Sequence, residues 1–286
     1  MIDSSHILVL NAAEGLLQIV IARRDALDGP VLLCAQEWHA PSQGAELLTP
    51  ALADAFARLR ITPGAIGRIA VVRGPGGFTG LRLAIATASG LARATGALQT
   101  GLEYLPLLAA SAFQGLPEAA TAPRRAWVLT HARRNLVHLQ GFEQKAQGVM
   151  PAPLCDIAVC SPEDAVALLA RSEAVTPFAG LGAGMGGTRP LVVGSGLTRN
   201  REAVEAALRA VYGTTGDCPC CLPPSCDHPA ARVLLDAALA SEYTSADPEP
   251  LYVRQPDAMD NLERIAASLG LNPADARKRV GELTGE

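Results

Sequence analysis

The feature that most constrains the fold is a glycine-rich segment, Gly74-Pro75-Gly76-Gly77-Phe78-Thr79-Gly80. An apolar run before it, Ile66–Val72, predicts a buried strand, and Leu81–Thr95 after it has the apolar spacing of a helix. Glycine allows backbone conformations and close approaches that a Cβ atom forbids. The segment therefore predicts a tight turn from a strand into a helix, with Thr79 as the expected N-cap.

Two interpretations of this turn stay open. A helix N-terminus presents unpaired N–H groups and a positive dipole end, which suit an anion such as phosphate. The alternative is a tight crossover without a ligand, because the turn lacks the lysine of a P-loop and the spacing of a dinucleotide fingerprint. A second turn, Gly194-Ser195-Gly196, also follows an apolar strand. The candidate anion-binding residues are Gly74, Gly76, Gly77, Thr79, Gly80, Gly194 and Gly196.

The order of the predicted elements indicates an α/β protein. Three strand-like runs open the chain, and strands then alternate with helices, which favours mixed sheets flanked by helices. A polar linker with prolines, from Pro117 to Arg125, separates two stretches that each contain one strand–glycine turn–helix unit. We expect an N-terminal lobe over residues 1–116, a C-terminal lobe over residues 117–256 and a helical extension over residues 257–286.

Composition narrows the functional class. The 24 Lys and Arg residues and 28 Asp and Glu residues give a net charge of −4, and aromatic residues make up only 4%. Both values argue against a protein that grips nucleic acid on its own. The sequence shows no signal-peptide pattern and no apolar run of the roughly 20 residues that a membrane span needs. We therefore expect a cytoplasmic protein without a membrane contact.

Two longer motifs point to a family. The segment around the first turn resembles the signature of the TsaB family, in which a serine takes the place of Gly77. Here it reads Val71-Val72-Arg73-Gly74-Pro75-Gly76-Gly77-Phe78-Thr79-Gly80-Leu81-Arg82. Pro250-Leu251-Tyr252-Val253-Arg254 is similar to the Pro-x-Tyr-Leu-Arg element near the end of that family's chains. The resemblance is sharp over about 20 residues and collinear over roughly residues 1–256.

The resemblance implies a fold and a role. The fold would be the two-lobed actin-like ATPase fold (ASKHA, ribonuclease H-like), in a member that has lost catalysis. The role would be that of a scaffold in forming N6-threonylcarbamoyladenosine at position 37 of tRNA. The implied partners are a TsaD-type catalytic paralogue, a TsaE-type ATPase and, through the complex, tRNA. The chain alone would form a homodimer, with weak nucleotide binding as the one cofactor left open.

Departures from the family pattern fit the absence of catalysis. The first strand ends in Asn11-Ala12-Ala13, where the family has Asp-Thr-Ser or Asp-Thr-Ala. That aspartate serves the metal–phosphate centre in active actin-like enzymes. The five histidines are scattered and form no metal-binding helix pair. We predict no catalytic residue, and keep as alternatives an active actin-like ATPase or small-molecule kinase that uses the glycine turns, and a glycoprotease.

Two helices offer a candidate partner interface. Small residues at four-residue spacing in Leu81–Thr95 would allow another helix to approach closely, and Ala45–Leu59 carries a matching apolar stripe. The competing interpretation is that these stripes pack onto the chain's own sheet. The candidate interface residues are Leu48, Leu52, Ala55, Leu59, Ala84, Ala88 and Ala92.

A cysteine-rich segment near residue 220 has two interpretations of its own. Cys218 and Cys221 have C-x-x-C spacing, and Cys226 with His228 would complete a four-ligand set for zinc. All four residues lie in one proline-rich stretch, whereas structural zinc sites pair two separated knuckles. We therefore predict no metal site, with zinc at these residues and a redox-active cysteine pair as the alternatives to a loop with free thiols.

Overall fold

The computed structural model describes residues 5–25, 29–40, 43–114, 124–146, 148–175, 189–213, 218–253 and 272. Residues 1–251 form one compact unit, and residues 252–286 form a second. The helices predicted over 257–286 and a glycine-rich stretch over 180–187 lie outside the described residues. The predicted boundary between two lobes at residue 117 falls inside the first unit and stays a prediction.

The first half of the compact unit is built on a five-stranded mixed sheet. Its strands are β1 (His6–Asn11), β2 (Leu16–Asp25), β3 (Gly29–His39), β4 (Ile66–Gly74) and β5 (Leu98–Glu103). They lie in the order β3-β2-β1-β4-β5. The first three are antiparallel, and β4 and β5 continue the sheet parallel to β1. The helices of this half are α1 (Gly44–Leu59), α2 (Phe78–Thr95) and α3 (Tyr104–Gln114).

The second half repeats this topology. Its strands are β6 (Arg124–Arg133), β7 (Leu136–Gln144), β8 (Ala152–Pro153), β9 (Ala158–Cys160), β10 (Leu191–Val193) and β11 (Cys220–Cys221). The order is β11-β10-β6-β7-β8, with β9 also paired to β7. An antiparallel β6–β7 pair followed by parallel β10 and β11 matches β1, β2, β4 and β5 in the first sheet. The predicted α/β fold with the ribonuclease H-like, actin-like topology is confirmed.

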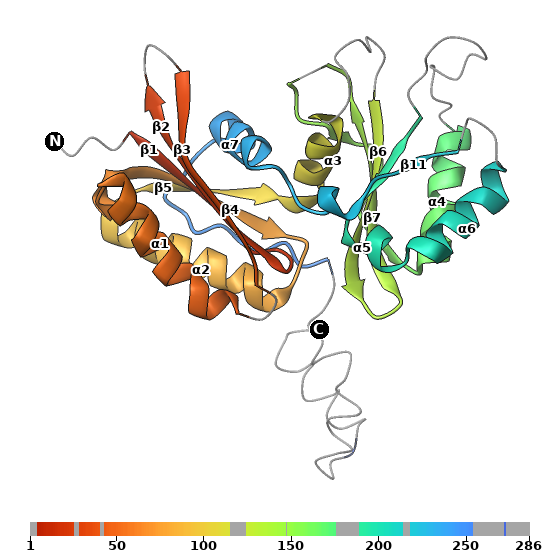
Figure 1. Cartoon of the computed structure of the whole chain (residues 1–286), viewed down its shortest axis with the longest axis horizontal. Coiled ribbons are helices and arrows are strands. Elements are labelled where there is room, and N and C mark those ends of the chain that lie inside the picture. Colours follow the sequence, from red (N-terminus) through yellow and green to blue (C-terminus); the bar gives the residue numbers. More distant parts are fainter. Residues whose placement is uncertain are drawn as a thin grey trace. The chain divides into compact units, whose positions relative to one another are not determined.

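The helices arrange the molecule in layers (Figure 1). The outer face of the first sheet packs against α1 and α2. The outer face of the second sheet packs against α4 (Pro162–Val175) and α6 (Arg201–Tyr212), which follow β9 and the one-turn helix α5 (Ser195–Arg199). The inner faces of both sheets share one core with α3 and α7 (Ala231–Ala240).

The two inner helices interlock the halves. Helix α3 follows a strand of the first sheet and packs against β6, β7 and β10 of the second as well as against β4 of the first. Helix α7 follows the second sheet but packs against β1, β2 and β5 of the first. Each half thus buries a helix contributed by the other, and the shared layer belongs to neither half alone.

Shortening a side chain in this inner layer should reduce stability more than shortening one at the surface. Leu108 lies in α3 and is 0% exposed, whereas Leu98 in β5 is 42% exposed. We expect Leu108→Ala to lower the free energy of unfolding by about 3 kcal/mol, because it removes buried methyl groups and leaves a cavity. Leu98→Ala should change it by less than about 1 kcal/mol. Urea unfolding measures both, and equal losses would contradict the layered core.

Candidate functional site

The first glycine turn lies between β4 and α2, as predicted, but its cap differs. The Gly74–Pro75 peptide is cis, and α2 begins at Phe78 with Gly77 in the N-cap position. Thr79, the predicted N-cap, lies in the first turn of the helix with its side chain exposed. The prediction was wrong because the turn is tight enough for the helix to start two residues earlier.

This turn packs directly on the end of β1. A Cβ atom at Gly76 would lie 2.2 Å from the Ala13 carbonyl oxygen, and one at Gly80 would lie 2.1 Å from the Ala12 carbonyl oxygen. The Gly77 N–H donates to the Ala13 carbonyl oxygen at 2.6 Å. A Cβ at Gly77 itself would make an ordinary 3.6 Å contact, so this position accepts the serine of the family pattern.

The second glycine turn repeats the arrangement on β6, at Leu129 and Thr130 in the middle of that strand. A Cβ atom at Gly194 would lie 2.4 Å from the Leu129 carbonyl oxygen, and one at Gly196 would lie 2.9 Å from it. In both halves, therefore, a turn after a parallel strand rests on the backbone of the strand beside it. Carbonyl oxygens carry partial negative charge, so they disfavour a phosphate in that place. These contacts account for the glycines as tight crossovers, and anion binding at either turn stays a prediction.

The close contact predicts a sharp difference between two glycines of α2. Gly80→Ala should lower the free energy of unfolding by about 2 kcal/mol or more, because its Cβ meets backbone that cannot rotate away. Gly90→Ala should raise it by about 1 kcal/mol, since no atom lies within 4 Å of that Cβ and alanine favours the helix. Thermal and urea unfolding test the pair. Equal stability of the two variants would remove the packing argument.

A chain of amide groups occupies the place of the family's aspartate. Asn11 and Gln18 are each 1% exposed. The Asn11 Nδ2 donates to Gln18 Oε1 at 2.7 Å, and Asn11 Oδ1 accepts the Ala13 N–H at 3.0 Å. The Gln18 Nε2 donates to Glu37 Oε1 and to the Pro229 carbonyl oxygen, each at 2.8 Å. The hydrogen bonds of Asn11 thus hold the loop after β1 and Gln18, and Gln18 links the sheet to the segment before α7.

Beside these amides, Glu14 joins the two halves. It sits in the loop after β1, and its Oε1 accepts a hydrogen bond from the Ser195 hydroxyl at 2.5 Å. Ser195 begins α5, and its Oγ accepts the His131 N–H at 2.9 Å. The Tyr104 hydroxyl donates to Glu14 Oε2 at 3.0 Å. One carboxyl group therefore contacts the first sheet's loop, the inner helix α3 and the second glycine turn.

The charges of this cluster are perturbed by burial. Burial raises the pKa of Glu14 from 4.5 to about 7, against the hydrogen bonds from Ser195 and Tyr104, which lower it. Burial also raises the pKa of Tyr104 well above its usual value, and the Glu14 charge adds to this. Burial raises the pKa of Asp227 and lowers that of His228. Perturbed pKa values mark functional sites, so this cluster is the candidate functional site.

Sequence reasoning did not find this cluster. Glu14 follows directly after the end of the first strand, where the topology brings it toward the second turn, and an acid at that position was the available signal. Tyr104 and Asp227 come from distant parts of the chain. The Asp227 carboxylate accepts a hydrogen bond from Thr198 Oγ1 at 3.0 Å, and its carbonyl oxygen lies 3.3 Å from the Tyr104 hydroxyl.

The predicted partner interface needs correction. All but one of its residues are buried in the outer core of the first sheet, and the remaining Leu59 is partly buried against that core. The residues are Leu48, Leu52, Ala55, Leu59, Ala84, Ala88 and Ala92. The spacing was real, but it marks the face that each helix turns to its own sheet. Arginine at Ala88, which is 0% exposed, would test folding rather than docking.

The cysteine-rich segment holds no metal cluster in the part of the chain that the structure describes. Neighbouring residues of a strand point to opposite faces, so Cys220 and Cys221 of β11 diverge. Cys220 and Cys226 pack against the inner core, while Cys218 and Cys221 pack against the outer core of the second sheet. Cys226 therefore packs against a different core from Cys218 and Cys221, and the zinc alternative at Cys218, Cys221, Cys226 and His228 stays untested. Burial raises the pKa of the Cys221 thiol to about 11, which leaves it protonated at neutral pH.

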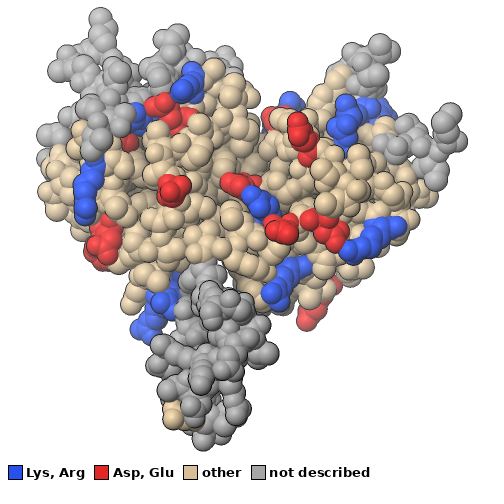
Figure 2. Space-filling view, turned by 180° about the vertical axis from the view of Figure 1, so that it is seen from behind, with Lys and Arg blue, Asp and Glu red and all other residues tan. Residues whose placement is uncertain are grey.

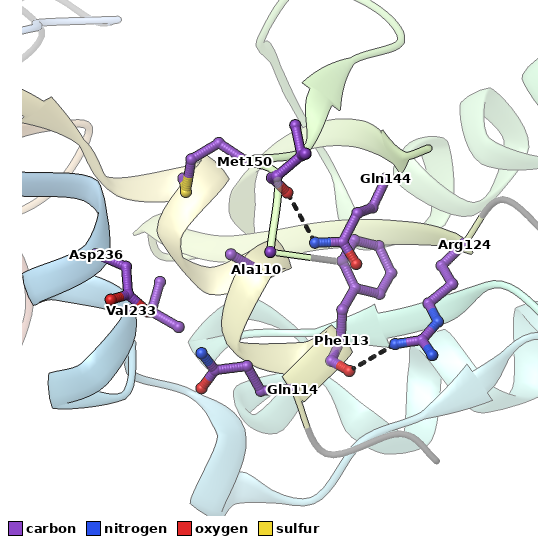
Figure 3. Close-up of a pocket in the computed structure, with 10 residues that line it drawn as sticks. Ala110, Phe113, Gln114, Arg124, Gln144, Met150, Val233 and Asp236 are labelled. Carbon is purple, nitrogen blue, oxygen red and sulfur yellow. Dashed lines mark hydrogen bonds between the residues drawn. The ribbon is translucent and has the colours of Figure 1, made fainter. Parts of the chain in front are cut away.

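A pocket of about 250 Å³ opens elsewhere, between α3, α7 and the end of β7 (Figure 3). Two of its polar side chains bond to backbone: Gln144 Nε2 donates to the Val149 carbonyl oxygen, and Arg124 Nη1 donates to that of Phe113. The other labelled lining residues are Ala110, Gln114, Met150, Val233 and Asp236. The pocket contains none of the residues of the Glu14 cluster or of either glycine turn.

Comparisons with known proteins support the resemblance to the TsaB family. Residues 39–175 match the model of the TsaD family, tRNA N6-adenosine threonylcarbamoyltransferase. An uncharacterized protein from Pseudomonas aeruginosa with similarity to peptidase YeaZ superposes with a TM-score of 0.62 at 21% identity, over 87% of this chain and 100% of that chain. YeaZ from the same organism gives a TM-score of 0.61 at 20% identity, with the same coverage. These structural matches show the fold.

A search of curated proteins found no match. Among the described residues, no helix is both long enough and apolar enough to cross a membrane.

Proposed function

We propose that this chain is a non-catalytic scaffold subunit, which supports a TsaD-type paralogue in forming N6-threonylcarbamoyladenosine at position 37 of tRNA. The YeaZ-like fold and the match to the TsaD-family model support this proposal. The observation that carries the absence of catalysis is the chemistry at the end of β1. Asn11 supplies a neutral amide whose Oδ1 and Nδ2 both bond within the chain, and carbonyl oxygens fill the space beside both glycine turns. Position 11 therefore lacks the carboxylate that the family pattern has there.

The surface of the chain fits a subunit that leaves tRNA binding to its partner. Figure 2 shows Lys and Arg interspersed with Asp and Glu on the described surface of one face, without a broad patch of a single sign. The net charge is −4. A protein that binds a polyanion alone usually concentrates cations on one surface. The proposed contact with tRNA is thus made through the complex, which also includes a TsaE-type ATPase and acts in the cytoplasm.

The proposed docking surface is the outward face of α2. A residue two positions before or after a buried residue of α2 lies about 200° around the helix from it. The outward face therefore also has residues at four-residue spacing, namely Arg82, Ala86, Gly90 and Ala94. All four are exposed. The Arg82 guanidinium lies 3.7 Å from the centre of the Phe78 ring, and Phe78 is 37% exposed.

Such a surface suits a second helix pair. Small residues at Ala86 and Gly90 let a partner helix approach closely, while a stacked arginine and an aromatic ring are frequent anchors of interfaces. We propose that this face binds the TsaD-type paralogue, and that in its absence it forms a homodimer with a second copy.

A substitution at the open glycine tests this surface. Gly90→Arg should weaken association with the TsaD-type paralogue at least tenfold, because it puts a long charged side chain on the docking face. Its thermal stability should be equal or higher, because arginine favours a helix over glycine. Ala206→Arg, at an exposed alanine of α6 on the other half, is the matched control and should bind normally. Calorimetric titration measures both, and normal binding by Gly90→Arg would reject the surface.

The functional assignment has its own test. Deletion of the gene for this chain should remove N6-threonylcarbamoyladenosine from tRNA, as measured by nucleoside analysis, and a plasmid copy should restore it. The purified chain should not hydrolyse ATP with magnesium. Hydrolysis by the chain alone would favour the active ATPase or kinase, and wild-type levels of the modified nucleoside in the deletion strain would exclude the scaffold role.

A further inference from the structure

We propose that the Glu14 carboxyl group is a proton-operated latch between the two halves, closed when the group is neutral and loosened when it is ionised. The inference uses only contacts within residues 1–251 and does not depend on the proposed partner. It assigns a regulatory device to the cluster around Glu14.

The first support for the latch is the position of Glu14 between elements of the two halves. Glu14 belongs to the loop after β1 in the first half, whereas Ser195 begins α5, directly after β10 of the second half. Their hydrogen bond, at 2.5 Å, joins these two halves through side chains. The Tyr104 hydroxyl reaches the other carboxyl oxygen from α3 in the shared inner layer. A change at this one group therefore acts on three elements at once.

The surrounding groups allow two complete hydrogen-bond patterns. With Glu14 ionised, Tyr104 and Ser195 both donate to its oxygens. With Glu14 neutral, its own proton can be donated to the Tyr104 oxygen. The Tyr104 proton then turns to the Asp227 carbonyl oxygen at 3.3 Å or to His228 Nδ1 at 3.2 Å. Glu14 can thus gain or lose its proton while Tyr104 and Ser195 keep a hydrogen-bond partner.

The charges that face Glu14 leave its ionised form poorly compensated. From α3 it meets only the hydroxyl of Tyr104, and from the segment before α7 it meets Asp227, whose charge repels it. Arg199 of α5 attracts it, but less strongly than burial opposes the charge. Arg201 acts on Asp227, and His228 lies behind Tyr104 with its pKa lowered. Opening toward water relieves the ionised carboxylate more than the neutral acid.

The same loop transmits any movement to α2. Ala13, next to Glu14, accepts the N–H of Gly77 at the start of that helix, and Gly76 and Gly80 rest on the backbone of Ala12 and Ala13. These are backbone contacts with no flexible side chain between them. Displacement of the loop therefore displaces the N-terminus of α2.

The direction with pH follows from linkage. The closed form holds its proton up to about pH 7, while a water-exposed carboxyl loses it near 4.5. The closed form is thus favoured at low pH, and the opening constant rises between these two values and levels off above pH 7. Between pH 5 and pH 8 the opening constant should rise by roughly 50-fold.

Amide hydrogen exchange of the full-length chain tests the pH dependence of the latch. The exchange rates are corrected for intrinsic exchange and converted into opening constants. The reporters are the His131 and Gly77 amides, which bond to Ser195 and Ala13. Their opening constants should rise with pH, while amides inside β1 and β2 should not follow. A parallel loss of protection in those strands would mean general destabilisation and would overturn the latch.

Three variants complete the test. Glu14→Gln keeps the shape but cannot ionise, so its opening constants should be low and flat across the pH range. Glu37→Gln, a carboxylate of the neighbouring amide chain, should keep the wild-type profile. Ser195→Ala removes a donor to the ionised form and also the acceptor of the His131 N–H, so it is followed at the Gly77 amide, where the midpoint should move upward by about one pH unit. A wild-type profile in Glu14→Gln, or an unmoved midpoint in Ser195→Ala, would reject the proposal.

Discussion

The structure depends on a contact between two pieces of backbone that only glycine permits. In each half, the turn after a central parallel strand rests on the backbone of the neighbouring strand or of the loop that follows it. The distances leave no room for a Cβ atom at Gly76, Gly80 or Gly194. This contact sets where α2 begins and how the loop after β1 runs. It thereby places Asn11 and Glu14 in the layer between the sheets. A site usually associated with phosphate here holds the chain's own carbonyl oxygens.

The polar centre of the compact unit consists of two networks of buried side chains. Asn11 and Gln18 form an amide chain that ends on Glu37 and on the backbone before α7. Glu14, Ser195 and Tyr104 form a second network that crosses between the halves. Buried polar groups of this kind are costly unless they are satisfied, and satisfied networks fix the relative position of the elements they join. In the proposed latch, the strength of the contact between the two halves depends on the proton of Glu14.

Much of the fold could be predicted from the sequence, because it is encoded locally. The apolar runs before the glycine turns predict β4 and β10 closely, whereas α2 begins at Phe78, three residues before the predicted Leu81; the repeated strand–turn–helix unit indicates the duplication. The predicted interface failed for a physical reason: the spacing of Ala84 and Ala88 shows which residues share a face, but not which face meets the sheet. Cys220 and Cys221 diverge because strand pairing, which the sequence does not show, sets their direction. Glu14 was missed because its partners meet it only through tertiary structure.

The exchange of α3 and α7 between the halves bears on how the protein is made. The inner face of the first sheet is completed by Val233 and Leu234, so a nascent chain carries an uncovered apolar surface until those residues leave the ribosome. Folding of the N-terminal part must wait for translation of nearly the whole compact unit, and a shortened chain that ends before α7 would present that surface to chaperones and proteases.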